Sequence, residues 1–194
     1  MRRVIVAITG ASGAIYGIRT LEMLRRIGDV ETHAILTSSA HRTIAHETCH
    51  SVEEVRTLAD HLYHPRDIGA AVSSGSFRTA GMIVAPCSVK TLSGIANSYN
   101  DELVVRAADV CLKERRRVVL LLRETPLHAG HIDLMARANA NGAVLMPPVP
   151  AFYALPQSID DIVDQTVSRA LELLDVVVPG IKRWDGSSVV PDET

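Results

Sequence analysis

Short apolar runs alternate along this chain of 194 residues with longer stretches in which hydrophobic residues recur every three or four positions. The short runs are typical of buried strands, and the longer stretches of helices that cover a sheet. The pattern predicts strands at 4–9, 31–36, 82–85, 118–122 and 143–146. It predicts helices at 14–27, 39–46, 52–62, 90–96, 101–114, 127–138 and 158–174. This alternation indicates a Rossmann-like three-layer α/β/α sandwich with a mostly parallel sheet.

Composition narrows the class of protein. Hydrophobic residues make up 47% of the chain and aromatic residues only 4%, so Val, Ile, Leu and Ala must build the core, as in buried parallel sheets. Twenty Lys and Arg against 22 Asp and Glu give a net charge of -2, and we therefore expect no nucleic-acid partner. No apolar run reaches the roughly 20 residues that span a bilayer. We expect a cytoplasmic protein without a membrane partner, with one domain at 1–186 and a polar tail at 187–194.

The three cysteines are Cys49, Cys87 and Cys111. Their spacing fits neither a metal-binding pair nor a disulfide framework. Cys87 follows a predicted strand and could be a nucleophile, but no base stands near it in the sequence. We expect a small buried thiol instead, and the same for Cys49 and Cys111.

Gly10, Ala11, Ser12 and Gly13 form the turn between the first strand and the first helix. Glycines permit a sharp turn and a close approach to a ligand, and the N–H groups of a helix start attract anions. The hydroxyls of Ser12 and Thr9 add donors. The turn could also need glycine for its geometry alone, and it lacks the dinucleotide pattern G-x-G-x-x-G. We expect it to bind a phosphorylated ligand.

A second donor-rich loop, with Ser88, Lys90 and Thr91, follows the strand predicted at 82–85, which we expect Pro86 to end. The carboxyl ends of parallel strands meet at one edge of the sheet, where open α/β folds bind their ligands. Two such loops at one edge favour a mononucleotide over an isolated anion.

Arg123 and Glu124 follow the strand predicted at 118–122. An Arg–Glu pair at this edge is placed to bind phosphate and transfer a proton, or it is a surface ion pair of little consequence. Position alone leaves both open. We expect most of the charge run at 113–117 to be a solvated helix end.

A series of motifs in this order resembles the UbiX family of flavin prenyltransferases, formerly regarded as aromatic-acid decarboxylases. The resemblance extends from residue 1 to about residue 186. The matching segments are Thr9-Gly-Ala-Ser-Gly-Ala14, Glu47-Thr48, Ser74-Gly-Ser76, Pro86-Cys-Ser-Val-Lys-Thr91, Arg106-Ala-Ala-Asp109, Leu112-Lys-Glu-Arg115, Arg123-Glu-Thr-Pro126, Pro147-Pro-Val-Pro-Ala-Phe-Tyr153 and Arg183-Trp184.

The resemblance implies a metal-independent transfer of a dimethylallyl group from dimethylallyl phosphate to N5 and C6 of reduced FMN. It assigns the catalytic roles to Ser12, Glu47, Glu124 and Trp184. It assigns FMN binding to Gly10, Ala11, Ser12, Thr37, Ser88, Val89, Lys90, Thr91 and Arg123. It assigns donor binding to Arg106, Lys113, Tyr153 and Arg169. Thr37-Ser38 stands where the family often has Ser-Lys, so this chain departs from the family at one of the implied FMN contacts.

The resemblance also implies partners. The family is homo-oligomeric, typically dodecameric, with sites shared between subunits, and its product, prenylated FMN, serves UbiD-type decarboxylases. Whether that decarboxylase acts in ubiquinone synthesis or in phenolic-acid breakdown is left open by the sequence. So is the choice between a mono- and a diphosphate donor. We expect no metal site.

Other interpretations compete with this one. His46-Glu47-Thr48-Cys49-His50 matches the zinc motif H-E-x-x-H, which requires one continuous helix. The capping box that begins at Ser51 instead starts a new helix. A flavin-dependent cysteine decarboxylase would carry a Met-Asn signature where this chain has Ser88-Val89-Lys90. A flavin carrier would not need Lys113, Glu124 or Arg169, and direct decarboxylation of an aromatic acid lacks an obvious acid-binding group.

Overall fold

The computed structural model describes residues 1–184 and 186, so the tail predicted at 187–194 lies outside the described residues. The strands are β1 (Arg2–Ile8), β2 (Val30–Leu36), β3 (His61–Tyr63), β4 (Gly81–Cys87), β5 (Arg117–Leu122) and β6 (Val144–Leu145). The α-helices are α1 (Ala14–Ile27), α2 (Ser38–Glu47), α3 (Val52–Thr57), α4 (Val89–Ala96), α5 (Leu103–Lys113), α6 (Ala129–Ala140) and α7 (Ile159–Glu172). Two short 3₁₀ helices are η1 (Ala71–Ser73) and η2 (Phe152–Ala154).

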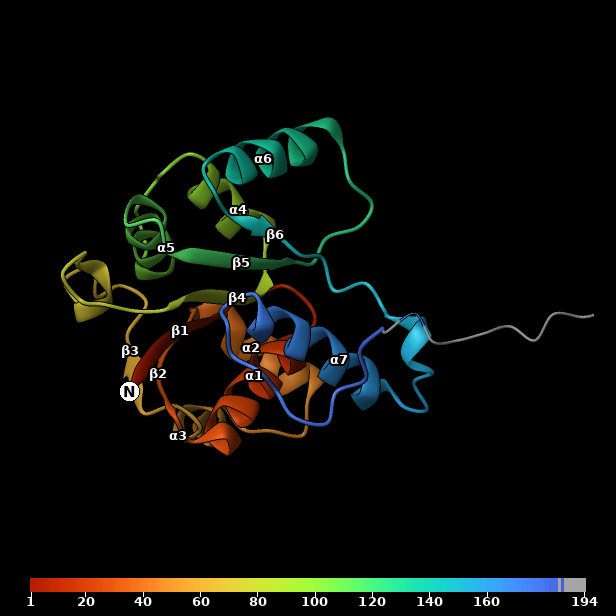
Figure 1. The fold of residues 1–194 in the computed structure, drawn as a ribbon. Coiled ribbons are helices and arrows are strands. Elements are labelled where there is room, and N and C mark those ends of the chain that lie inside the picture. Colours follow the sequence, from red (N-terminus) through yellow and green to blue (C-terminus); the bar gives the residue numbers. More distant parts are fainter. Residues whose placement is uncertain (185, 187–194) are drawn as a thin grey trace, which may run out of the picture.

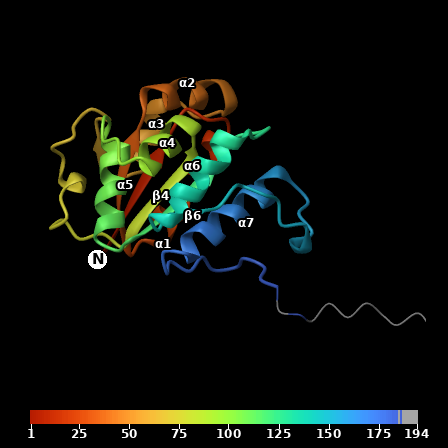
Figure 2. The same ribbon diagram turned by 90° about the horizontal axis from the view of Figure 1, so that it is seen from above.

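The strands form one sheet in the order β3-β2-β1-β4-β5-β6, and neighbouring strands pair in parallel throughout the described residues. Helices α1, α2, α3 and α7 pack on one face, and α4, α5 and α6 on the other (Figures 1 and 2). This confirms the predicted Rossmann-like three-layer sandwich, and the strand order is the Rossmann one.

Strand β1 lies at the centre of the sheet and is buried on both faces. Val4, Val6 and Ile8 point into the core under α1 and α7. Ile5 and Ala7 point into the core under α4 and α5. Side chains alternate between faces along a strand, so a doubly covered strand needs apolar residues at every position. This is why an uninterrupted apolar run predicted β1 correctly.

Helix α1 packs closely against the sheet at Gly17. A Cβ atom at this position would collide with the carbonyl oxygen of Ala85 and would lie 2.6 Å from Cγ1 of Ile8. The bare backbone of Gly17 therefore lets α1 lie directly on β1 and β4. Because α1 follows the loop at 9–13, this contact also fixes the position of that loop.

The helix predicted at 52–62 is wrong in its second half, because α3 ends at Thr57 and residues 61–63 form the edge strand β3. Thr32 and Asp60 cause the change of direction. The carboxylate of Asp60 accepts from the N–H and hydroxyl of Thr32 at 2.7 and 2.8 Å, and the Thr32 hydroxyl accepts from the Asp60 N–H at 2.9 Å. These bonds bring residue 60 to β2 and start a strand beside it.

The strand predicted at 82–85 is too short. Strand β4 continues through Pro86 to Cys87, with an irregular register against β5 between Val84 and Cys87. Proline lacks an N–H donor and is tolerated in strands at such irregularities, so Pro86 does not end the strand as expected. Other predicted boundaries differ by a few residues. Helix α6, for example, begins at Ala129 because the His128 side chain caps it, accepting from the N–H of Gly130 at 3.0 Å.

Across the described residues, no helix has the length and hydrophobicity needed to cross a membrane.

Gly17→Ala tests the packing of α1 on the sheet. The added methyl group must displace Ile8 or the β4 backbone, and overpacking of this kind costs about 1–3 kcal/mol, more than the roughly 1 kcal/mol of helix propensity that alanine gains. We expect a lower urea midpoint at an unchanged slope. Gly69→Ala is the matched control, because its Cβ would meet only Asp67 Oδ1 at 3.6 Å. Equal midpoints for both variants would contradict the close contact.

Candidate active site

The side chain of Thr9 joins the carboxyl ends of β1 and β4. Its Oγ1 donates to the carbonyl oxygen of Pro86 at 2.7 Å and accepts from the N–H of Ser88 at 3.0 Å. The strand order reverses between β1 and β4, with β2 beyond one and β5 beyond the other. Open α/β sheets bind their ligands in the crevice at such a reversal. The two loops predicted to bind a ligand therefore meet where the fold is suited to hold one.

The N-termini of α2 and α4 open onto one hollow of about 510 Å³ at this edge, called here the first hollow. Thr37 caps α2 by accepting from the N–H of Ala40, and Ser88 caps α4 by accepting from the N–H of Thr91, both at 3.3 Å. The positive ends of two helix dipoles favour an anion between them. Lining the first hollow are Thr9, Thr37, Ser38, Ser39, Arg42, Arg66, Ser88, Lys90, Thr91 and Glu102.

Positive charge exceeds negative charge around the first hollow, because Arg42, Arg66 and Lys90 face one carboxylate, Glu102. The Nζ of Lys90 lies 2.8 Å from Glu102 Oε1 and 3.8 Å from Asp101 Oδ2. The Lys90 side chain is 62% exposed, and ion pairs of this kind contribute little. Lys90 can therefore turn from Glu102 toward an anionic ligand at small cost.

Several predicted FMN contacts come together in the first hollow, namely Thr37, Ser88, Lys90 and Thr91. Sequence reasoning missed five further lining residues, Ser38, Ser39, Arg42, Arg66 and Glu102. The first three lie in the opening turns of α2, so the helix-start argument applied to α4 would have found them. Arg66 follows β3, which was not predicted, and carries no sequence signal.

A second hollow of about 360 Å³ shares Ser39 and Arg42 with the first. The loop after β1 reaches it through Gly10, where a Cβ would collide with the side chain of Ser39. Glycine at this position therefore allows the loop to lie against α2. Lining the second hollow are Gly10, Ser12, Ser39, Arg42, Thr43, His46 and Glu47. Ala11 and Val89, also predicted to contact FMN, line neither hollow.

The start of α1 is occupied by a carboxylate of the protein itself. Glu47 Oε2 accepts from the N–H of Gly13 at 2.7 Å and from that of Ala14 at 3.4 Å. A ligand phosphate at this helix start would have to displace Glu47. The first hollow, whose two helix starts have neutral hydroxyl caps, is the better position for a phosphate.

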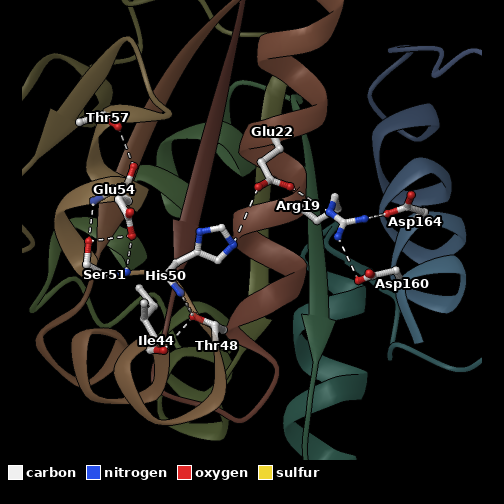
Figure 3. Close-up of polar contacts among 10 residues, drawn as sticks. All are labelled: Arg19, Glu22, Ile44, Thr48, His50, Ser51, Glu54, Thr57, Asp160 and Asp164. Atoms are coloured by element: carbon white, nitrogen blue, oxygen red, sulfur yellow. Dashed lines mark hydrogen bonds and ion pairs between the residues drawn. The ribbon is translucent and has the colours of Figure 1, made fainter. Parts of the chain in front are cut away.

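The chain after Glu47 is held by local hydrogen bonds (Figure 3). The Thr48 hydroxyl donates to the carbonyl of Ile44 at 2.9 Å and accepts from the N–H of His50 at 3.2 Å, which closes the end of α2. Nε2 of His50 lies 4.0 Å from Glu22 Oε1 on α1. Because α2 ends at Glu47, His46 and His50 do not share a helix. The zinc-protease interpretation of this motif is therefore excluded.

Arg19 ties α1 to α7 (Figure 3). Its guanidinium pairs with Asp164, with Asp160 at 3.1 Å and with Glu22 on its own helix at 2.9 Å. The Arg19 side chain is only 16% exposed, and charge pairs away from water are screened less than surface pairs. The helix that carries Arg169 is thereby fixed against the helix that follows the first loop.

A third hollow of about 260 Å³ gathers three other predicted residues, Tyr153, Arg169 and Trp184. The rings of Tyr153 and Trp184 meet edge to face with centroids 6.0 Å apart. Arg169 pairs with Glu172 at 3.3 Å, and Arg183 pairs with the same carboxylate at 2.6 Å. Partial burial acts to raise the pKa of Glu172, but the bonds from Arg183 and Arg169 outweigh it and lower that pKa.

Arg123 and Glu124 follow the end of β5 and are exposed. The N–H of Arg123 donates to the carbonyl of Cys87 at 3.1 Å, which places it beside the second loop. Burial raises the pKa of Tyr16 and the charge of Arg123 opposes that rise, so Arg123 also lies within electrostatic reach of α1. The ion pairs found in the described residues do not include one between Arg123 and Glu124. The interpretation of these two as a surface ion pair therefore loses its support.

Arg106 and Lys113 lie apart from all three hollows in the single chain. Lys113 ends α5, shortly before β5 begins, and so lies toward the amino edge of the sheet, where it pairs with Glu114. Arg106 pairs with Asp109 at 3.4 Å. Most of this charge run was expected to be solvated. Arg116 is an exception, because it donates to the carbonyls of Phe77 and Gly75 at 2.8 and 2.6 Å.

Cys87 and Cys111 are buried, as predicted. Complete burial raises the pKa of the Cys87 thiol to about 12, and because the thiolate is the nucleophile, Cys87 is inert at neutral pH. The prediction for Cys49 is wrong, because this residue is exposed beyond the end of α2.

Comparison with known proteins agrees with this geometry. The profile of the Flavoprotein family matches residues 1–171. The flavin prenyltransferase UbiX of Salmonella typhimurium is 56% identical over 189 residues, which cover 96% of this chain and all of that relative.

Two solved structures are similar over almost the whole chain. The crystal structure of AnUbiX (PadA1) in complex with FMN and dimethylallyl pyrophosphate is 50% identical, with a TM-score of 0.93, and covers 95% of this chain and 98% of that one. The dodecameric FMN-dependent UbiX-like decarboxylase from Escherichia coli O157:H7 is 47% identical, with a TM-score of 0.92, and covers 95% of this chain and all of that one. The chain therefore belongs to the Flavoprotein family and, within it, to the UbiX flavin prenyltransferases.

Proposed function

We propose that this protein is a flavin prenyltransferase that joins the dimethylallyl group of dimethylallyl phosphate to N5 and C6 of reduced FMN. The observation that carries the proposal is the pair of adjoining hollows at the strand reversal, one suited to a phosphate and one reached by Gly10 and Ser12. The name and contents of the related AnUbiX structure, which holds FMN and dimethylallyl pyrophosphate, support it.

The first hollow is the proposed site of the FMN phosphate. Helix-start N–H groups, the hydroxyls of Thr37 and Ser88 and the charges of Arg42, Arg66 and Lys90 converge there. Charge-assisted hydrogen bonds from such groups are the strong ones in phosphate binding. Thr37 offers the hydroxyl that this position needs, so its departure from the family's usual serine does not remove a donor.

The flat flavin ring then extends toward the second hollow, along Gly10, Ala11 and Ser12. Reduced FMN supplies the nucleophilic atoms of the reaction. Ser12 contributes a hydroxyl beside the ring, and Glu47 holds the loop in place through the N–H of Gly13 at 2.7 Å. We assign this positioning role to Glu47 first, because its Oε2 atom already accepts hydrogen bonds from the N–H groups of Gly13 and Ala14.

The donor phosphate is assigned to Arg169 and Tyr153 in the third hollow. When the allylic C–O bond breaks, its electron pair leaves with the phosphate, and cationic donors stabilise the charge that develops there. Trp184 and Tyr153 present aromatic faces that exclude water from the allyl group. Glu124 or the departing phosphate accepts the proton released from C6 as the ring closes.

Residues 1–186 are proposed as one flavin-binding domain that works as a homo-oligomer, with twelve subunits as the related E. coli structure is described. Arg106 and Lys113 would then come from a neighbouring subunit, since they lie apart from the hollows of their own chain. We further propose a cytoplasmic location and delivery of prenylated FMN to a UbiD-type decarboxylase. The first and second hollows would also suit a flavin carrier or a cysteine decarboxylase, so the donor-binding set of the third hollow, Tyr153, Arg169 and Trp184, is what favours prenyl transfer over these alternatives.

Lys90→Ala tests the position of the FMN phosphate. Loss of one charge-assisted bond costs about 1.5–3 kcal/mol, so FMN affinity should fall about tenfold or more. Riboflavin, which lacks the phosphate, should bind the variant as it binds the wild type. Fluorescence titration of both flavins gives the two constants. Arg56→Ala on the surface of α3 is the control. An equal loss for both flavins would place the phosphate elsewhere.

Glu124→Gln tests proton transfer. The amide keeps the shape of the side chain but cannot accept a proton, so we expect FMN to bind normally and prenylation to fall at least about a hundredfold. The measurement is the mass of flavin released after anaerobic incubation of reduced FMN with dimethylallyl phosphate. Glu53→Gln on α3 serves as the control. Wild-type turnover in Glu124→Gln would remove Glu124 from the mechanism.

Mixed oligomers test the sharing of the site. Lys113→Ala and Glu124→Gln should each be nearly inactive alone, yet co-expressed subunits that carry two different tags should regain activity. If the two residues come from different subunits, about a quarter of the sites in a random mixture contain both native residues. Oligomers purified through both tags that stay inactive would show that each site uses one chain only.

A further inference from the structure

Glu31, His33 and His61 gather at the β2–β3 edge of the sheet, where the register places His33 directly beside His61. Oε1 of Glu31 lies 3.3 Å from Nε2 of His33 and 3.0 Å from Nε2 of His61. All three ligand atoms lie within 4.8 Å of one another. Nothing in the proposed flavin chemistry uses these residues.

His33 has one ring nitrogen without a partner. Its side chain is 2% exposed, and Nε2 forms no hydrogen bond despite its closeness to Glu31. The other nitrogen, Nδ1, is 3.0 Å from the hydroxyl of Tyr63. An unpaired buried polar atom is costly. A histidine that binds a metal through one nitrogen and donates from the other to a neighbour has the usual arrangement of a metal ligand.

Two of the three ligand–ligand distances match a tetrahedral coordination sphere. Bonds of about 2.0–2.1 Å at tetrahedral angles separate neighbouring ligand atoms by about 3.3 Å. The Glu31–His33 and Glu31–His61 separations are 3.3 and 3.0 Å. The two imidazole rings are stacked 4.7 Å apart at 13°, so one ring must turn to direct both nitrogens at one point. His61 is half exposed on an edge strand and has the room to turn.

The surroundings fix the carboxylate. Nε of Arg3 lies 2.9 Å from Oε2 of Glu31, which leaves Oε1 for the histidines. The Arg3 guanidinium also stacks on Phe77, with 4.6 Å to the ring centroid. The bond from Arg3 is the main cause of the lowered pKa of Glu31. Arg3 thus orients the carboxylate, although its positive charge opposes a cation and reduces affinity.

We propose that Glu31, His33 and His61 bind one Zn²⁺ ion that fastens the short edge strand β3 to β2. Two imidazoles and one carboxylate are a donor set that zinc takes readily, with water in the fourth position. Strand β3 has only three residues and is therefore weakly held against β2. A zinc ion bound by residues of both strands would stabilise this edge of the sheet. This site could not be predicted from the sequence, because its ligands match no motif.

The zinc site is separate from the flavin site. Glu31 is the second residue of β2, whereas Thr37 follows the last. At about 3.3 Å per residue the two ends are about 20 Å apart. The zinc proposal therefore stands or falls independently of the prenyltransferase proposal, and prenyl transfer itself remains free of metal.

The test is titration of ZnCl₂ into chelator-treated, FMN-loaded protein, followed by calorimetry and by thermal unfolding. We expect one ion per protomer and a higher Tm with zinc. Because His33 is buried, the variants are His61→Ala and Glu31→Gln, which change side chains nearer the surface. Each should weaken zinc binding at least tenfold and remove the zinc-dependent rise in Tm.

The matched control is the double variant His128→Ala and His131→Ala, which removes another pair of neighbouring histidines, on and beside α6, whose rings are tilted by 33° with centroids 3.7 Å apart. It should bind zinc as the wild type does. Cobalt(II) added in place of zinc should give the intense visible absorption of a tetrahedral site in the wild type and the control only. Wild-type zinc affinity in His61→Ala and Glu31→Gln, or loss of binding in the control, would overturn the proposal.

Discussion

The site depends on the buried hydroxyl of Thr9, which joins β1 to β4. This one group satisfies the carbonyl of Pro86 and the N–H of Ser88 where the strand order reverses. A buried main-chain group without a hydrogen bond costs about 1–3 kcal/mol. The Thr9 hydroxyl avoids this cost for both groups by forming a hydrogen bond with each. Ser88 is thereby held at the start of α4, and the loop before α1 is held beside it. Both hollows follow from this joint.

A second constraint decides where negative charge can bind. Helices α1, α2 and α4 begin at the carboxyl edge beside the strand reversal, and each start attracts an anion. At α1 the protein fills that position with Glu47, whereas α2 and α4 are capped by the neutral hydroxyls of Thr37 and Ser88. The phosphate-binding capacity of the edge is therefore concentrated between α2 and α4. In the proposed function the glycine-containing loop before α1 contacts the uncharged, flat flavin ring, and not the phosphate expected from its sequence.

The layers of the fold could be predicted because the central strands are buried on both faces and read as apolar runs. Strand β3 could not, because His61–Tyr63 lies at an edge and forms only when Asp60 bonds to Thr32, far away in the chain. The helix starts at residues 38 and 89 follow local rules, so Thr37, Ser88, Lys90 and Thr91 could be found. Arg66 could not be found, because it lines the first hollow only as a result of following the unpredicted β3. The hydrogen bond from the N–H of Gly13 to Glu47 joins the start of α1 to the end of α2, and no local sequence pattern encodes the packing of these two helices.

Three cations of the proposed site are paired with carboxylates. Lys90 is paired with Glu102, while Arg169 and Arg183 share Glu172. A phosphate carries more charge than a carboxylate and accepts more hydrogen bonds, so it can take over Lys90 from Glu102, or Arg169 from Glu172, which then keeps Arg183. Binding then exchanges one ion pair for a stronger one. The geometry of the hollow need not change, which is the preorganisation that stabilises a charge developing on a departing phosphate.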